Sequence, residues 1–203
     1  MASIYELKPA FQSLLRPLVK RMAGAGVRAN AVTVVAAGLS ALVGLALFVW
    51  PGAAGPLLVL PAFLVARMAL NAIDGMLARE HDQQTRLGAF LNELGDVVSD
   101  AALYLPLALV ASLNPVLIVL IVVLGIIAEM TGVISQMLAG ERRYDGPMGK
   151  SDRALVFGAL ALWAGLGGAL DPWADWLLAL VLALSLLTIL NRARGGLAGD
   201  RRA

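Results

Sequence analysis

Cysteine is absent from the sequence, and histidine occurs once, at His81. Without cysteine the chain can form no disulfide, no thiolate metal site and no thiol nucleophile. Charged side chains are also scarce, at 15% of the 203 residues, compared with about 25% in soluble domains. The sequence has no internal repeat, and its first residues lack the apolar core and small-residue cleavage site of a cleavable signal. We therefore expect one domain, over residues 1–203, that is not an ordinary soluble protein.

Apolar residues are correspondingly abundant. They make up 60% of the chain, and the mean hydropathy is +0.81. A membrane-spanning helix needs about 20 predominantly apolar residues, so the long apolar runs predict an all-α integral membrane protein with six transmembrane helices. The predicted spans lie at about residues 31–50, 57–79, 85–112, 116–138, 153–170 and 174–191.

Lysine and arginine occupy alternate joints between these spans. They precede the first span, lie between the second and third and between the fourth and fifth, and follow the last. The other joints, WPGAAGP, SLNP and GGALDPWAD, have neither residue. Because cytoplasmic loops retain positive charge, we expect both termini to face the cytoplasm. This topology accounts for the basic residues except Arg67, so the net charge of +2 does not indicate a nucleic-acid partner.

The segment before the first span predicts an interfacial amphipathic helix over about residues 3–24. Apolar side chains recur at helical spacing from Ile4 to Met22, with basic residues mostly on other faces. Ser3 and Glu6 have the spacing of a capping box, which begins a helix. Asn30 and Thr33 follow where the first span should start, a position that suits side-chain caps.

Charge is concentrated between the second and third spans, in residues 71–100. The polar or small residues on one face of the second helix are Asn71, Asp74, Gly75, Ala78 and Arg79. Those of the third helix recur every four residues: Gly88, Asn92, Asp96 and Asp100. Antiparallel neighbours at equal depth have residue numbers of nearly constant sum, since each helix rises about 1.5 Å per residue. Asp74 should therefore lie opposite Asn92 or Glu93, and Asn71 opposite Asp96, around a cleft that opens to the cytoplasm.

The residue types in these two stripes predict a metal and phosphate site. The oxygen donors without histidine or cysteine favour Mg²⁺ or Mn²⁺ over zinc; they are Asn71, Asp74, Asn92 and Asp96. Gly75 and Gly88 would let a bulky ligand approach the backbone, and Arg79 could hold a phosphate. A network that merely joins the helices is the structural alternative. Arg67 is expected to be structural, neutralised by Asp100 or Glu129.

The spacing resembles the signature of the CDP-alcohol phosphotransferases, D-x2-D-G-x2-A-R-x8-G-x3-D-x3-D. This chain reads N-x2-D-G-x2-A-R-x8-G-x3-N-x3-D from Asn71 to Asp96. The six-span pattern and the VRANAVT lead into the first span are also similar to that family, in particular to a bacterial subgroup with asparagine at the first and third aspartate positions. The resemblance implies an enzyme of phospholipid biosynthesis in the bacterial inner membrane. Such an enzyme transfers a substituted phosphate from a CDP-linked donor, usually CDP-diacylglycerol, to an alcohol and releases CMP.

The resemblance also implies roles for individual residues. The metal positions, for one or two ions of Mg²⁺ or Mn²⁺, are Asn71, Asp74, Asn92 and Asp96. The positions that cradle the cytidine diphosphate are Asp74, Gly75, Ala78, Arg79 and Gly88. Asp96 takes the place of the aspartate that accepts the proton of the attacking hydroxyl, and a homodimer is usual for the family.

Asparagine at positions 71 and 92 removes two negative charges from the implied metal site. Three outcomes follow: a site for a single metal, a weaker site that recruits Glu93 or Asp100, or a catalytically silent relative that binds CDP-lipid. A small transporter is a further alternative. It would require polar residues through the whole membrane thickness, whereas the outer joints are nearly uncharged.

The basic loop over residues 139–155 is the candidate acceptor site. Arg143, Lys150 and Arg153 would suit an acceptor that carries its own phosphate, such as glycerol 3-phosphate or an inositol phosphate. The run GKSDRAL is loosely similar to a basic motif of relatives that use inositol phosphate. Topology alone also predicts positive charge here, so the acceptor alcohol stays open.

Overall fold

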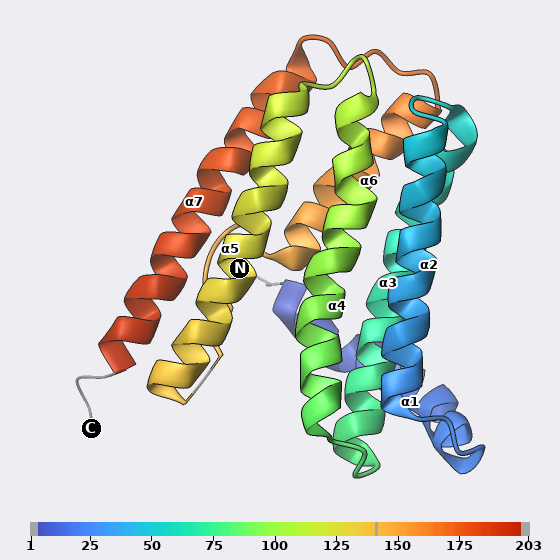
Figure 1. The fold of residues 1–203 in the computed structure, drawn as a ribbon, viewed down its shortest axis with the longest axis vertical. Coiled ribbons are helices and arrows are strands. Elements are labelled where there is room, and N and C mark those ends of the chain that lie inside the picture. Colours follow the sequence, from blue (N-terminus) through green and yellow to red (C-terminus); the bar gives the residue numbers. More distant parts are fainter. Residues whose placement is uncertain (1–3, 141, 200–203) are drawn as a thin grey trace. The chain divides into compact units, whose positions relative to one another are not determined.

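The computed structural model describes residues 4–140 and 142–199, with side chains from 9 to 140 and from 142 to 198. Every regular element within these ranges is a helix (Figure 1). In chain order they are α1 (Ile4–Gly24), α2 (Ala29–Val49), α3 (Ala54–Glu80), α4 (Arg86–Tyr104), the short 3-10 helix η1 (Leu105–Leu109), α5 (Pro115–Ala139), α6 (Lys150–Gly165) and α7 (Trp173–Gly199). The all-α prediction is confirmed for this part of the chain. Ser3, expected to begin the first helix, lies outside the described residues.

Among the described residues, four helices are long and apolar enough to cross a membrane: α2, α3, α5 and α7. The other two predicted spans correspond to α4 and α6. α6 has only 16 residues, and α4 carries Arg86, Glu93, Asp96 and Asp100 within 19 residues. The count of six spans and the cytoplasmic termini therefore stay predictions.

Two helices end earlier than the predicted spans. The third span was expected to reach residue 112, but α4 ends at Tyr104 and η1 follows. Pro106 lies in the first turn of η1, and a proline has no N–H with which to continue an α-helix. The fifth span was expected to reach residue 170, whereas α6 ends at Gly165. Gly167 then adopts φ +80°, a conformation that glycine tolerates best.

The chain forms two compact units. The first comprises the residues up to 42 and residues 63–99, and the second comprises residues 43–62 and those from 100 onward. The signature residues from Asn71 to Asp96 all belong to the first unit, whereas Arg143, Lys150 and Arg153 belong to the second.

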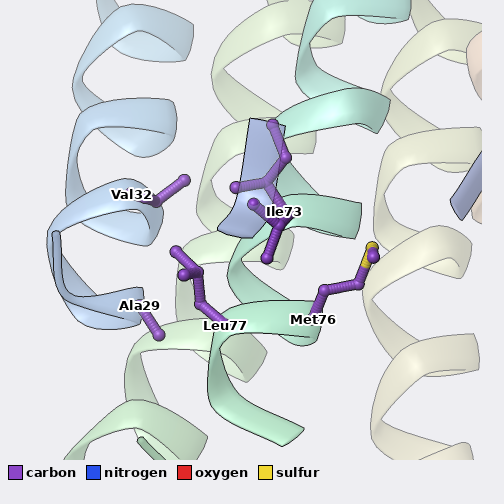
Figure 2. Packing of buried hydrophobic residues seen from close by; sticks show 6 residues of the cluster. Ala29, Val32, Ile73, Met76 and Leu77 are labelled. Carbon is purple, nitrogen blue, oxygen red and sulfur yellow. The ribbon is translucent and has the colours of Figure 1, made fainter. Parts of the chain in front are cut away.

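A small hydrophobic core joins α1, α2 and α3 in the first unit. Its buried members are Val19, Ala29, Val32, Ile73, Met76 and Leu77. Figure 2 shows Ala29 and Val32 of α2 directed towards Ile73 and Leu77 of α3. Val19, which is fully buried, brings α1 into the same core. The amino-terminal helix is therefore packed against α3, while Leu14 and Leu18 stay exposed.

A charged contact on the surface adds to this packing. The Arg16 guanidinium donates to both carboxylate oxygens of Glu80, at 3.1 and 3.0 Å, and so ties α1 to the end of α3. This hydrogen bond raises the pKa of Arg16 above its usual value. Because the pair is exposed to solvent, we expect it to contribute little to stability.

Side chains from the α3–α4 turn hold the beginning of α2. Gln83 Oε1 accepts from the amide of Ala29 at 2.7 Å, and Gln83 Nε2 donates to the carbonyl of Val27 at 3.2 Å. Gln83 therefore satisfies a free amide at the start of α2. Asn30 Nδ2 instead donates to Thr85 Oγ1 at 3.3 Å. At this helix start, which Asn30 was expected to help cap, the amide of Ala29 is thus satisfied by a residue 54 positions after Ala29 in the chain.

The second unit is built on α5 and α7, which lie side by side (Figure 1). Ser135 of α5 donates to the carbonyl of Arg192 on α7 at 3.2 Å. The rings of Tyr104, the last residue of α4, and Phe157 of α6 stack with centroids 4.4 Å apart. Met148, in the loop before α6, donates its amide to Thr188 Oγ1 at 2.9 Å, which attaches this loop to α7.

Candidate functional site

The signature residues lie in the last turns of α3 and the first turns of α4, as the sequence predicted. Asp74 is buried, and Asn71, Asn92 and Asp96 are half-buried. The two helices are joined by the short turn that contains Gln83 and Thr85. The structure therefore places the signature residues of both stripes, from Asn71 to Asp96, in the first unit, whereas Asp100 belongs to the second.

Asp96, one of the two signature carboxylates, contacts two residues of α3. Asn71 Nδ2 donates to Asp96 Oδ1 at 3.1 Å, which confirms the predicted pairing of these two residues across α3 and α4. Arg67 Nη2 lies 3.5 Å from the same oxygen and donates to the backbone carbonyl of Asp96 at 3.1 Å. The side chain of Arg67 is only 4% exposed. Its contact with Asp96 was not predicted, since the sequence suggested Asp100 or Glu129 as partner.

Asp74 is bound by a residue of α2. Thr33 Oγ1 donates to Asp74 Oδ2 at 2.8 Å and also lies 3.2 Å from the carbonyl of Ala29. Thr33 was expected only to cap the first span. Its hydroxyl instead fixes the orientation of one of the two signature carboxylates.

The signature contains small residues at positions 75, 78 and 88. Neighbouring side chains of the protein are sufficient to explain why these residues are small, without a bound ligand. A Cβ on Gly88 would lie 2.6 Å from Asn30 Oδ1, so glycine here makes room for the Asn30 side chain. A Cβ on Gly75 would lie 3.0 Å from Arg79 Nη2, because the exposed Arg79 folds back over it. Ala78 packs against the hydrophobic core of α1, α2 and α3. The roles of these residues towards a nucleotide stay predictions.

The described residues contain no group of three or more histidine, cysteine, aspartate or glutamate side chains placed to hold a metal ion. The predicted donor set instead combines two carboxylates, Asp74 and Asp96, with the amides of Asn71 and Asn92. Carboxylate and amide oxygens are ligands that Mg²⁺ and Mn²⁺ accept. The residue types of the predicted donor set therefore suit such an ion.

The three candidate acceptor residues have different surroundings. Arg153 is buried, donates to the carbonyl of Met148 at 3.2 Å, and lies 3.4 Å from Glu129 Oε1 and 3.8 Å from Asp100 Oδ2. Arg143 is half-buried, with Nη1 3.9 Å from Asp145 Oδ2. Lys150 is half-buried as the first residue of α6. Of the three, only Arg153 is buried.

The sequence did not predict the arginine cluster around Glu129. Its carboxylate lies 3.2 Å from Arg142, 3.4 Å from Arg153 and 3.3 Å from Arg192. Arg192 is almost fully buried and also donates to the carbonyl of Ala128 at 2.7 Å. A signal was present, because Glu129 is the charged residue of an otherwise apolar α5, and such residues are expensive in a membrane unless they are paired.

Comparisons with known proteins agree with the signature. The sequence profile of the CDP-alcohol phosphatidyltransferase family matches residues 27–165. The chain is 49% identical over 198 residues to the inner membrane protein YnbA of Escherichia coli (strain K12), and the match covers 95% of each chain.

Two solved structures of the Mycobacterium tuberculosis phosphatidylinositol phosphate synthase PgsA1 are similar in fold. The structure with CDP-DAG bound has a TM-score of 0.73 at 19% identity, over 89% of this chain and 92% of that chain. The complex with manganese and citrate has a TM-score of 0.68 at 20% identity, over 89% and 88%. At these identities the similarity shows a shared fold.

Proposed function

Because the chain belongs to the CDP-alcohol phosphatidyltransferase family, we propose that it transfers a phosphatidyl group from a CDP-linked lipid to an alcohol and releases CMP. CDP-diacylglycerol is the proposed donor, and the protein acts in phospholipid biosynthesis. The observation that carries the proposal is the contact between Asn71 and Asp96, which joins the two halves of the signature across α3 and α4. PgsA1, a synthase of similar fold, has been captured with CDP-DAG, and this supports the choice of donor.

Asp96 is the proposed general base. In the reaction, the acceptor oxygen forms a bond to the phosphorus that carries the lipid, the bond from that phosphorus to the bridging diphosphate oxygen breaks, and CMP leaves with the electron pair. The proton of the acceptor hydroxyl passes to the Asp96 carboxylate. Asn71 and Arg67 both contact this residue, so its position is fixed before a substrate arrives.

Mg²⁺ or Mn²⁺ is the proposed cofactor. Asp74, Asp96 and the amide oxygens of Asn71 and Asn92 would hold it, and a bound divalent ion supplies positive charge that stabilises the diphosphate and the departing CMP. Thr33 orients Asp74 for this role. The complex of PgsA1 with manganese supports the choice of metal.

The nucleotide and acceptor positions follow from the family signature and from charge. We propose that the residues around the cytidine diphosphate are Asp74, Gly75, Ala78, Arg79 and Gly88. Arg143, Lys150 and Arg153 are the proposed contacts of a phosphate-bearing acceptor. Since Arg153 already contacts Glu129 and Asp100, the half-buried Arg143 and Lys150 are the more accessible pair.

The proposed setting is the bacterial inner membrane. The name of the E. coli relative supports this location, and four long apolar helices support a multi-pass protein. We further propose six spans with both termini and the site on the cytoplasmic side, and a homodimer.

Release of CMP tests the proposed function directly. The purified full-length protein in detergent is expected to release CMP from CDP-diacylglycerol only with Mg²⁺ or Mn²⁺ and with one acceptor of a panel. The panel contains glycerol 3-phosphate, inositol phosphate, serine and simple polyols. Binding of CDP-diacylglycerol without CMP release for any acceptor would instead favour a catalytically silent lipid-binding protein.

Substitutions at Gly88 and Asn30 can separate a structural role of Gly88 from its proposed role in donor binding. Gly88→Ala is expected to lower both the melting temperature and CMP release, because the new methyl group meets Asn30. If this contact is the whole cause, the double variant with Asn30→Ala recovers both quantities. Recovery of the melting temperature alone would show that the glycine is also needed for a close approach of the donor, as the signature implies.

A further inference from the structure

A buried cation lies beside the proposed metal site. Arg67 precedes Asn71 by one helical turn, and its guanidinium contacts both the carboxylate and the backbone carbonyl of Asp96. A buried charge is costly unless it is paired, so Arg67 holds a negative partner permanently in the first unit. Topology does not account for this residue, because it lies inside α3 and not in a cytoplasmic joint.

The orientation of Asn71 removes one place for a metal ion. Its Nδ2 group is 3.1 Å from Asp96 Oδ1, and an N–H group that donates to a carboxylate leaves no space for a cation between the two atoms. An aspartate at position 71, as in the family signature, would repel Asp96 at this distance unless a cation lay between them. The hydrogen bond of Asn71 therefore does what a bridging ion would do for two carboxylates.

The charges of the proposed site balance with one divalent ion. Asp74 and Asp96 are negative, Arg67 and Arg79 are positive, and the donor diphosphate carries two further negative charges. One divalent ion makes the sum zero, whereas a second would leave an excess of two positive charges. Glu93 is half-buried on α4. Among the described residues, Asp74, Asp96 and Glu93 do not lie close enough together to hold a metal ion as a group of three carboxylates.

We propose that Arg67 takes the electrostatic place of a second metal ion, so that this protein binds a single divalent ion per chain. The inference rests on the proposed function, because it concerns the same site. It also gives a physical reason for asparagine in place of aspartate, since one divalent ion together with the single charge of Arg67 carries less positive charge than two divalent ions and needs fewer carboxylates to balance it.

Electron paramagnetic resonance of Mn²⁺ tests the number of ions without measuring turnover. The full-length protein in detergent, saturated with CDP-diacylglycerol, is titrated with Mn²⁺, and the signal of the free ion gives the bound amount. We expect one Mn²⁺ per chain. Two per chain would overturn the inference and leave the proposed function intact. No bound Mn²⁺ would also overturn it, and if CMP is not released either, the proposed function fails as well.

Two substitutions of Arg67 test its part in this balance. Arg67→Gln removes the charge, and Arg67→Lys keeps it. Because a fixed positive charge repels a nearby divalent ion, Arg67→Gln is expected to tighten Mn²⁺ binding at least about tenfold, and Arg67→Lys to change it by less than about threefold. Equal Mn²⁺ affinity in the two variants would overturn the inference.

Asn71→Asp supplies a second test that leaves Arg67 in place. The new carboxylate repels Asp96 until an ion binds between them, so Mn²⁺ is expected to raise the melting temperature of this variant more than that of the natural protein. An equal Mn²⁺ response in both proteins would mean that the Asn71 amide does not substitute for an ion.

Discussion

Asp96→Asn is expected to slow CMP release by about 100- to 10,000-fold, the usual contribution of a general base. An amide cannot take the proton of the acceptor hydroxyl. The amide oxygen can still accept from Asn71 and Arg67, which now contact Asp96 Oδ1 and the backbone carbonyl. We therefore expect the variant to fold and to bind CDP-diacylglycerol while it fails in turnover.

The measurement is the initial rate of CMP release at saturating donor and acceptor, together with the melting temperature and donor affinity. Asp82→Asn is the matched control, because Asp82 is exposed in the α3–α4 turn and its φ of 53° suits asparagine as well as aspartate. A rate for Asp96→Asn equal to that of Asp82→Asn would remove Asp96 from the reaction and leave its contacts with Arg67 and Asn71 as purely structural.

Glu129→Gln is expected to cause the largest loss of stability of any single substitution discussed. The carboxylate faces Arg142, Arg153 and Arg192 within 3.4 Å, and neutralising it leaves these guanidinium groups with fewer negative partners. Removing one partner of a buried ion pair costs about 3 to 5 kcal/mol. In a protein of this size, that loss corresponds to a fall in melting temperature of about 6 to 20 °C.

Thermal unfolding in detergent checks this result against Glu80→Gln. The pair of Glu80 with Arg16 is exposed, so its loss is expected to leave the melting temperature nearly unchanged. A second substitution, Arg142→Gln, should recover part of the stability of Glu129→Gln because it removes one uncompensated charge. An unchanged melting temperature in Glu129→Gln alone would show that the arginines find sufficient partners without it.

The helical spacing of the sequence was sufficient to predict the two polar stripes and the contact between Asn71 and Asp96. Spacing defines the face and the depth of a residue on its helix, and for two antiparallel helices joined by a short turn these quantities nearly determine which residues meet. The resemblance to the family was recognised from the same residues. Their spacing in the sequence reflects the helix faces on which they lie.

Contacts between more distant segments could not be predicted in this way. Thr33 reaches Asp74 from α2, and Gln83 reaches back to α2 from the turn after α3. Glu129 meets arginines from a loop, from α6 and from α7. A sequence shows that burying such a polar or charged group costs free energy. It does not show which partner offsets that cost, since several partners were available to each group.

Helix ends were predicted less well than helix faces. Hydropathy extended the third and fifth spans through Pro106 and Gly167, where the backbone leaves the α-helical conformation. Apolar residues continue beyond both points, so composition alone could not locate the ends.

The burial of Val19 among Ile73, Met76 and Leu77 has a consequence for how the protein responds to its surroundings. Asp74 lies between Ile73 and Met76 on the same helical turns, so a displacement of α1 is passed to the part of α3 that carries this carboxylate. If α1 lies among the lipid headgroups, as the sequence predicts, crowding or charge in that layer acts on the geometry of the site. The membrane surface would then influence the position of Asp74 through α1, besides supplying the proposed lipid substrate.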